Sequence, residues 1–412
     1  MVATDGPLQR TVRLGNPTER TRYDWAMPRE RIYLDHAALA PLTPAARDAM
    51  IPLLGESLGN PASPHLEGRA AKDVLEDART RIARALGCRP REVIFTSGAT
   101  ESAAIALHGA AYAGAAAERR RIVVSAIEYP AVLDTAQALG AMGMEVVVPP
   151  VGADGVVDSQ AFLEHVDPDT TAVACLMLAN HETGAVQQVA DVAEALRAMR
   201  IPFLCDASLA AGRLPVERPH LDADLTLFSS VKVGGPAGAG ALIVRRGTRI
   251  QPFLHGGVQE ERLRPGTENV AACAGFAAAF EAAIAGREAR GAAYTTLLDT
   301  FLAGVADLEG CRVVTDEASR VPGVVTLELR DVEGEAAMIN MDLEGIAIAT
   351  GSTCALGSAD PSPGLLAMGM SRKRASSTVR VSVGEGTTQE HVSHAASTLC
   401  RIVSRLHSLA RR

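Results

Sequence analysis

The stretch EVIFTSGATESAAIALHGAAYAGA, residues 92–115, decides the fold class because it joins a strand to a helix through a glycine turn. Residues 92–97 are mostly apolar or β-branched and predict a buried strand, whereas residues 101–115 predict a helix. Similar apolar runs recur downstream and alternate with helical segments such as residues 189–199. We therefore expect an α/β fold with a mostly parallel sheet sandwiched by helices. The further buried strands are predicted at residues 121–126, 145–150, 171–178, 202–207, 224–229 and 240–246.

The length of the chain, 412 residues, exceeds what one simple core supports, so we expect two domains. Residues 1–30 are polar and Arg-rich and predict an irregular N-terminal arm. Residues 31–285 carry the alternation of strands and helices and form the predicted large domain, whose first part can pack with the small domain. Residues 286–412 mix strands such as 323–330 with amphipathic helices, which predicts a smaller α+β domain.

The composition excludes several classes of function. The net charge of −8 gives no basic footprint for nucleic acid. The sequence contains no apolar run of about 18 residues, so no membrane span is predicted. The N-terminus lacks the apolar core of a signal peptide, so we expect a cytoplasmic protein. The seven cysteines lie far apart without a CxxC pair or Cys/His cluster, so no metal site is predicted.

Three polar features lie at the carboxyl ends of predicted strands. Gly98, Ala99 and Thr100 begin a helix, where they form either a phosphate cradle or an ordinary helix cap. Asp206 either pairs with a cationic ligand atom or caps the next helix. Lys232, in a glycine-rich loop, either forms a Schiff base or lies on the surface. Together they match what pyridoxal phosphate (PLP) requires: an amine for its aldehyde, a carboxylate for its pyridine nitrogen and a cradle for its phosphate.

Six ordered blocks extend this pattern over about residues 31 to 400, and through them the chain resembles the cysteine desulfurase family. This family belongs to the PLP-dependent class V aminotransferase group of fold type I. The blocks are IYLDHAALAPL (32–42), the segment 59–87, VIFTSGATES (93–102), HGGVQEERLRPGTENVA (255–271), the segment 332–370 and SSTVRVSVGEGTT (376–388).

The resemblance implies a role for each site residue, named here by its number in this chain. Catalytic roles are implied for Lys232, Cys354 and Tyr129, and substrate binding for Arg380 and Asn180. Cys354 would attack the sulfur of cysteine, leaving alanine and a persulfide that passes to a sulfur-acceptor protein. A homodimer is implied, with Thr267 reaching the cofactor phosphate of the partner subunit. The implied cofactor-binding residues are Gly98, Ala99, Thr100, Tyr129, His181, Asp206, Ser229, Lys232 and Thr267.

Four residues around the expected cofactor ring depart from the family pattern. Tyr129 replaces a histidine, His181 an asparagine, Leu209 a glutamine and Val231 a histidine. These differences keep two other hypotheses open beside the cysteine desulfurase. One is a PLP-dependent C–S lyase that cleaves an S-substituted cysteine by β-elimination, or a related enzyme of specialised metabolism. The other is a degenerate member that acts as a scaffold or sulfur-relay partner.

Overall fold

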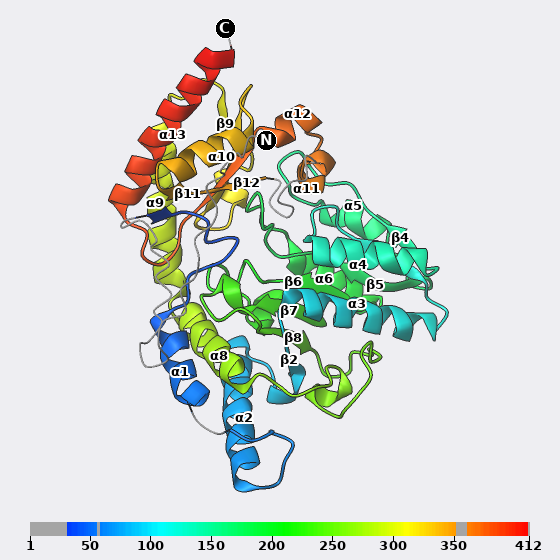
Figure 1. The fold of residues 1–412 in the computed structure, drawn as a ribbon. Helices are drawn as coiled ribbons and strands as arrows, with labels where there is room; N and C mark the ends of the chain where they lie inside the picture. Colours follow the sequence, from blue (N-terminus) through cyan, green and yellow to red (C-terminus); the bar gives the residue numbers. More distant parts are fainter. Residues whose placement is uncertain (1–30, 56–57, 352–360, 411–412) are drawn as a thin grey trace, which may run out of the picture.

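The computed structural model describes residues 31–55, 58–351 and 361–410, and its centre is a seven-stranded sheet (Figure 1). The strand order is β2-β8-β7-β6-β5-β3-β4. These strands are β2 (Val93–Thr96), β3 (Arg121–Val124), β4 (Glu145–Val147), β5 (Thr171–Cys175), β6 (Phe203–Asp206), β7 (Leu225–Ser229) and β8 (Gly240–Val244).

The sheet is parallel except at β8, which pairs antiparallel with both β2 and β7. Two antiparallel pairings in succession leave β2 running in the same direction as β7. The carboxyl ends of β2, β3, β5, β6 and β7 therefore meet at one edge, where parallel sheets bind ligands. The prediction of a mostly parallel sheet is confirmed, but β4 is not a buried strand: it lies at the sheet edge, where Glu145 is exposed.

Alternate side chains of the strands pack on opposite faces of this sheet, as the two-residue period of a strand requires. Val123 and Cys205 join the core on one face, whereas Ile122 and Leu204 join the core on the other. The first core includes α1 (Pro44–Gly55), α2 (Leu66–Leu86), α5 (Ser159–Glu164), α6 (Val189–Ala198), α7 (Arg218–Leu221) and α8 (Val270–Ala285), and the second includes α3 (Ala99–Ala115) and α4 (Pro130–Ala141).

A four-stranded antiparallel sheet in the order β12-β13-β10-β9 forms a second layer, covered by the long helices α9 and α13. A separate parallel pair joins β1 (Ile32–Tyr33) to β11 (Ile346–Ala347), so the start of the described chain lies against this smaller unit (Figure 1). The remaining elements here are β9 (Cys311–Val313), β10 (Val324–Leu329), β12 (Ala349–Thr350), β13 (Thr378–Ser382), α9 (Arg287–Val305), α10 (Gly334–Leu343), α11 (Pro363–Ala367), α12 (Arg372–Ser376) and α13 (Gln389–Ala410).

Helices α8 and α9 link the two sheets and meet at Gly286 with a bend of 74°. In the part of the chain that the structure describes, no single helix is long and apolar enough to cross a membrane. The bent pair α8–α9 reaches the required length and apolar composition only when the two helices are taken together. The predicted division into residues 31–285 and 286–412 stays a prediction, and the predicted arm, residues 1–30, lies outside the described residues.

Candidate active site

The N-terminus of α3 presents unsatisfied backbone N–H groups at the carboxyl end of β2. Gly98 is its N-cap residue and no side chain caps the helix. Strand β8 passes close beneath this turn, since a Cβ at Gly240 would lie 2.6 Å from the Gly98 Cα. Thr100 is exposed in the first turn. Free N–H groups and the positive end of the helix dipole suit a phosphate.

Lys232 lies one turn beyond β7, in the short 3₁₀ helix Ser230–Lys232 that follows Ser229. Its Nζ donates hydrogen bonds to the carbonyl oxygens of Ala37 and Ala38, at 2.6 and 2.8 Å. The turn after it needs glycine, because Gly234 has φ +75° and a Cβ there would lie 2.6 Å from Thr43 Cγ2. The glycine-rich loop thus fixes the lysine against the N-terminal segment.

Asp206 is the last residue of β6, which lies next to β7, the strand that leads to Lys232. Asp206 is only 8% exposed. Its Oδ1 accepts a hydrogen bond of 2.8 Å from the Ser208 N–H. Burial raises the pKa of Asp206, while the Ser208 hydrogen bonds and the positive charge of Lys232 oppose the rise. A buried carboxylate is costly unless it is paired, so the group suits a cationic ligand atom.

A second buried carboxyl group, Glu128, lies near Asp206 and was not singled out from the sequence. Its Oε1 accepts a hydrogen bond of 2.6 Å from the Met177 N–H. Burial and the neighbouring charge of Asp206 raise the pKa of Glu128 well above its ordinary value. The signal that could have found it is a charged residue in the loop after β3, four residues beyond the end of that strand.

Arg380 lies in the middle of β13, is 2% exposed and points from the smaller sheet toward the large one. Its Nη1 donates to the His181 carbonyl oxygen at 2.7 Å, and its Nη2 pairs with Asp35 Oδ1 at 2.8 Å. Its Nε is buried without a hydrogen-bond partner. The guanidinium therefore keeps donor capacity for a carboxylate, as its predicted role requires.

Asn180 builds the loop after β5. Its Nδ2 donates to the Ile127 carbonyl oxygen at 2.8 Å, and its Oδ1 accepts from the N–H groups of Glu182 and Thr183. The amide thus holds the adjoining β3 and β5 loops together. Its predicted contact with substrate stays a prediction.

Tyr129 and His181 follow neighbouring strands and touch through their rings. Their centroids are 4.8 Å apart and the planes lie at 74°, an edge-on contact. Leu209 is 5% exposed and belongs to the apolar core, so it presents no polar group here. Val231 contributes only its carbonyl oxygen, which accepts from the Ala40 N–H at 2.8 Å.

The predicted roles of two further residues, Thr267 and Cys354, are not tested by the structure. Thr267 is exposed in the loop between Arg262 and α8, and its predicted contact across a dimer stays a prediction. Cys354 lies outside the described residues, so its predicted role as nucleophile is likewise a prediction.

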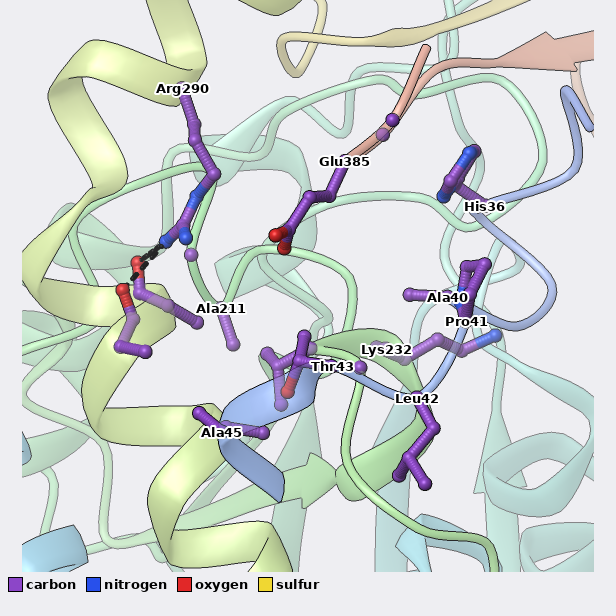
Figure 2. A pocket seen from close by; sticks show the side chains of 18 of the residues that line it. His36, Ala40, Pro41, Leu42, Thr43, Ala45, Ala211, Lys232, Arg290 and Glu385 are labelled. Carbon is purple, nitrogen blue, oxygen red and sulfur yellow. Dashed lines mark hydrogen bonds between the residues drawn. The ribbon is translucent and has the colours of Figure 1, made fainter. Parts of the chain in front are cut away.

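A cavity of about 480 Å³ opens on the side of Lys232 that faces the N-terminal segment (Figure 2). Figure 2 shows Glu385 pointing toward the middle of its lining and Lys232 beside Ala40 and Pro41, while Arg290 donates hydrogen bonds to the carbonyl oxygens of Ala282 and Ala283. Asp206, Tyr129 and His181 are not among its lining residues. Lys232 therefore lies between this cavity and the cluster at the strand ends.

The described residues fit PLP. Among the described residues, two buried polar atoms of the site have no hydrogen-bond partner, His181 Nδ1 and Arg380 Nε. Buried polar atoms are nearly always satisfied, so such a group marks a place for a polar ligand. The amine, the carboxylate and the open helix N-terminus supply the three contacts that this cofactor needs.

Comparison with known proteins identifies the family of the chain. The family model described as aminotransferase class-V matches residues 32–394. The cysteine desulfurase IscS of Dictyoglomus turgidum is 36% identical over 385 residues, which cover 93% of this chain and 97% of that protein. A solved structure of a NifS-like protein is 31% identical with a TM-score of 0.85, covering 91% of this chain and 100% of the other. The structure described as SspA in complex with cysteine is 28% identical with a TM-score of 0.74, covering 85% of this chain and 98% of that one.

The chain belongs to the class V aminotransferase family, whose members use PLP. Within that family its similar proteins are cysteine desulfurases of the IscS and NifS type. The resemblance drawn from the sequence blocks and the expected α/β fold are both confirmed.

Proposed function

We propose that this protein is a PLP-dependent cysteine desulfurase that converts L-cysteine to L-alanine and places the released sulfur on Cys354. One observation carries the proposal. The α3 N-terminus, Asp206 and Lys232 follow β2, β6 and β7, whose carboxyl ends meet at the same edge of one sheet. The cysteine desulfurase named among the similar proteins supports the substrate.

Each of these groups has a defined part in holding the cofactor. The N–H groups at Gly98, Ala99 and Thr100 hold the phosphate, and the Asp206 carboxylate holds the protonated pyridine nitrogen. Lys232 supplies the amine, which the backbone carbonyls of residues 37 and 38 already orient. When bound, PLP supplies an electron sink for the bonds at the α-carbon of an amino acid.

The substrate is recognised through its carboxylate. The Arg380 guanidinium is planar and always charged, and it suits two parallel hydrogen bonds to a carboxylate. Its hydrogen bonds to Asp35 and to the His181 carbonyl oxygen hold the plane of the guanidinium in place. Arg380 therefore binds and orients the amino acid beside Lys232.

The transfer of sulfur balances without an outside oxidant or reductant. The Cβ–S bond of cysteine breaks, an S–S bond to Cys354 forms and a C–H bond forms at Cβ. The hydrogen gained at Cβ equals the proton that the Cys354 thiol loses. A sulfur-acceptor protein then removes the persulfide sulfur, and a homodimer in which Thr267 contacts the partner's cofactor phosphate completes the proposal.

The test is product analysis on purified protein loaded with PLP. L-cysteine with a thiol reductant is expected to give alanine and sulfide in equal amounts. Lys232→Ala should abolish both products and remove the visible absorbance band of the bound cofactor. Cys354→Ala should keep the band and lose the persulfide, which mass spectrometry detects on the wild-type chain.

Pyruvate and ammonia in place of alanine would contradict the proposal and identify a C–S lyase instead. Failure of the wild-type protein to acquire the absorbance band would point to the scaffold hypothesis. Full turnover by Cys354→Ala would exclude the persulfide route.

A further inference from the structure

The Tyr129–His181 pair is the feature of this site that the assigned roles leave unexplained. The two residues follow β3 and β5, which are neighbours in the sheet. Their rings meet edge-on with centroids 4.8 Å apart. The backbone on either side of the imidazole is fixed, because Arg380 Nη1 binds the His181 carbonyl oxygen and the Asn180 amide binds the neighbouring loop. The imidazole thus has a defined position.

One ring nitrogen of this imidazole is available for chemistry. His181 Nδ1 is buried and accepts or donates no hydrogen bond within the described residues. A buried polar atom of this kind calls for a partner that the protein itself does not provide. The two positive charges that act on His181 are those of Arg380 and Lys232, which are assigned to the substrate and the cofactor. The missing hydrogen-bond partner of Nδ1 therefore belongs to the bound ligands.

His181 is neutral in the folded protein and, while no ligand is bound, a weak base. Burial, with smaller contributions from the charges of Arg380 and Lys232, lowers the pKa of His181 to about 3. The ring is therefore neutral near pH 7, with one nitrogen carrying a proton and the other a lone pair. A tyrosine hydroxyl has an ordinary pKa of about 10 and so still holds its proton near pH 7, which leaves the imidazole as the group of this pair that has a free lone pair for a proton.

When Arg380 binds a substrate carboxylate, that negative charge offsets one of the two cations that depress the proton affinity of His181. Binding of substrate thus raises the pKa of His181 by removing part of the smaller, charge-based contribution, while burial, the larger cause of the lowered pKa, remains. Tyr129 contributes the edge-on contact that orients the ring.

We propose that His181 is the acid–base residue of this site, taking up a proton from the bound amino acid and returning one to the carbon that loses sulfur. This inference rests on the proposed function and assigns Tyr129 to positioning rather than proton transfer. It therefore revises the catalytic role that the resemblance implies for Tyr129. The atom balance is unchanged, because His181 carries protons and consumes none.

The test compares two histidines in similar surroundings. His108 also has a buried Nδ1 without a partner, and its ring stacks on Phe253 at 4.0 Å, but it lies in the middle of α3 away from the cluster. His181→Asn keeps a polar atom near the position of Nδ1 yet cannot transfer protons. We expect His181→Asn to lower kcat by about 10²–10⁴-fold with its cofactor absorbance retained. His108→Asn should stay within about threefold of the wild-type kcat.

A second readout does not depend on turnover. In protein labelled with ¹⁵N-histidine, the His181 resonances are identified by their loss in His181→Asn. Adding the product L-alanine to the PLP-loaded protein should shift these resonances and leave those of His108 in place. Tyr129→Phe, which keeps the ring, should reduce kcat less than His181→Asn does.

The inference is wrong if His181→Asn keeps kcat within threefold of wild type, or if L-alanine leaves the His181 resonances unmoved. These outcomes differ from a failure of the proposed function, in which the wild-type protein itself makes no alanine from cysteine. If His181→Asn does not fold, His181→Gln takes its place both for identifying the His181 resonances and for the comparison of kcat.

Discussion

Glu182 lies between the two described ends of the segment that carries Cys354. Its Oε2 accepts a short hydrogen bond from the Ser362 hydroxyl, and its Oε1 is buried and has no hydrogen-bond partner among the described residues. A Cβ at Gly351 would lie 2.7 Å from that Oε1, so the backbone approaches the carboxyl closely. Burial raises the pKa of Glu182 to about 8, although the Ser362 hydrogen bond and Arg380 oppose the rise. The folded protein therefore keeps this carboxyl protonated at neutral pH.

Glu182→Gln should flatten part of the dependence of stability on pH. An acid whose pKa is raised by folding binds a proton in the folded state that the unfolded state releases above about pH 4.5. Its stabilising effect is complete below that pH and is lost as the pH rises through about 8. Urea unfolding at pH 5.5 and 8.5 should show a smaller loss of unfolding free energy for Glu182→Gln than for wild type. Equal losses in both proteins would contradict this, and Glu164→Gln, at an exposed glutamate of α5, is the matched control.

The sequence predicted the residues that follow strands, because a strand end and its direction are local properties. Lys232 and Asp206 could be placed in this way. Asp35 and Glu182 could not, because their partners Arg380 and Ser362 are 345 and 180 residues away. Their importance depends on contacts that only the tertiary fold creates.

At the scale of elements, a buried ion pair joins α2 to the loop before α8. Arg79 binds Glu260 through two parallel hydrogen bonds of 2.8 and 2.7 Å, and Glu260 also accepts from the Phe95 N–H at 2.7 Å. Both side chains are at most 9% exposed. This pair connects a helix, strand β2 and the loop that carries Thr267.

Removing the charge of Glu260 should be costly, because it leaves the buried Arg79 guanidinium with the half-exposed Glu76 carboxylate in place of its buried counter-ion. We expect Glu260→Gln to lower the free energy of unfolding by about 3–5 kcal/mol, measured by urea denaturation. The matched control is the exposed pair of Lys373 and Asp331, where Lys373→Gln should leave the urea midpoint of unfolding nearly unchanged. An equally small loss of unfolding free energy at both pairs would show that the buried pair does not stabilise the fold more than the exposed one.

Helices and strands were predicted correctly where the spacing of apolar residues and the position of turn residues point to the same element, as at residues 92–115. The expected strand 145–150 is shorter and more exposed than predicted, because an apolar run alone does not distinguish an edge strand from a central one. The two-residue strands β1, β11 and β12 carry no pattern long enough to recognise. They exist because distant strands pair with them.

For the molecule as a whole, the N-terminal segment 32–38 joins the two sheets. Leu34 is fully buried in the core of the smaller unit, while Ala37 and Ala38 receive the Lys232 ammonium from the larger one. Pairing with β11 fixes the start of this segment. The segment thus connects the lysine of one unit with the arginine of the other.

Leu34→Ala should lower the free energy of unfolding by about 2–5 kcal/mol, because it removes buried methyl groups and leaves a cavity. Hydrogen exchange measured by mass spectrometry should show the loss of protection first in β10 and β13, which share its core, rather than in β5 and β6. If protection were lost equally in both sheets, the two sheets would unfold as one unit, contrary to this prediction.

The pairing of Asp35 with Arg380 has a consequence for synthesis of the chain. A ribosome adds about 5–20 residues per second, so the 345 residues between them take roughly 20–70 s to make. During that time the first segment has emerged while its arginine, its strand partner and the helices that cover Leu34 do not yet exist. A prematurely terminated chain would carry Lys232 and Asp206 without the guanidinium, and its apolar N-terminal segment would be exposed to chaperones and proteases.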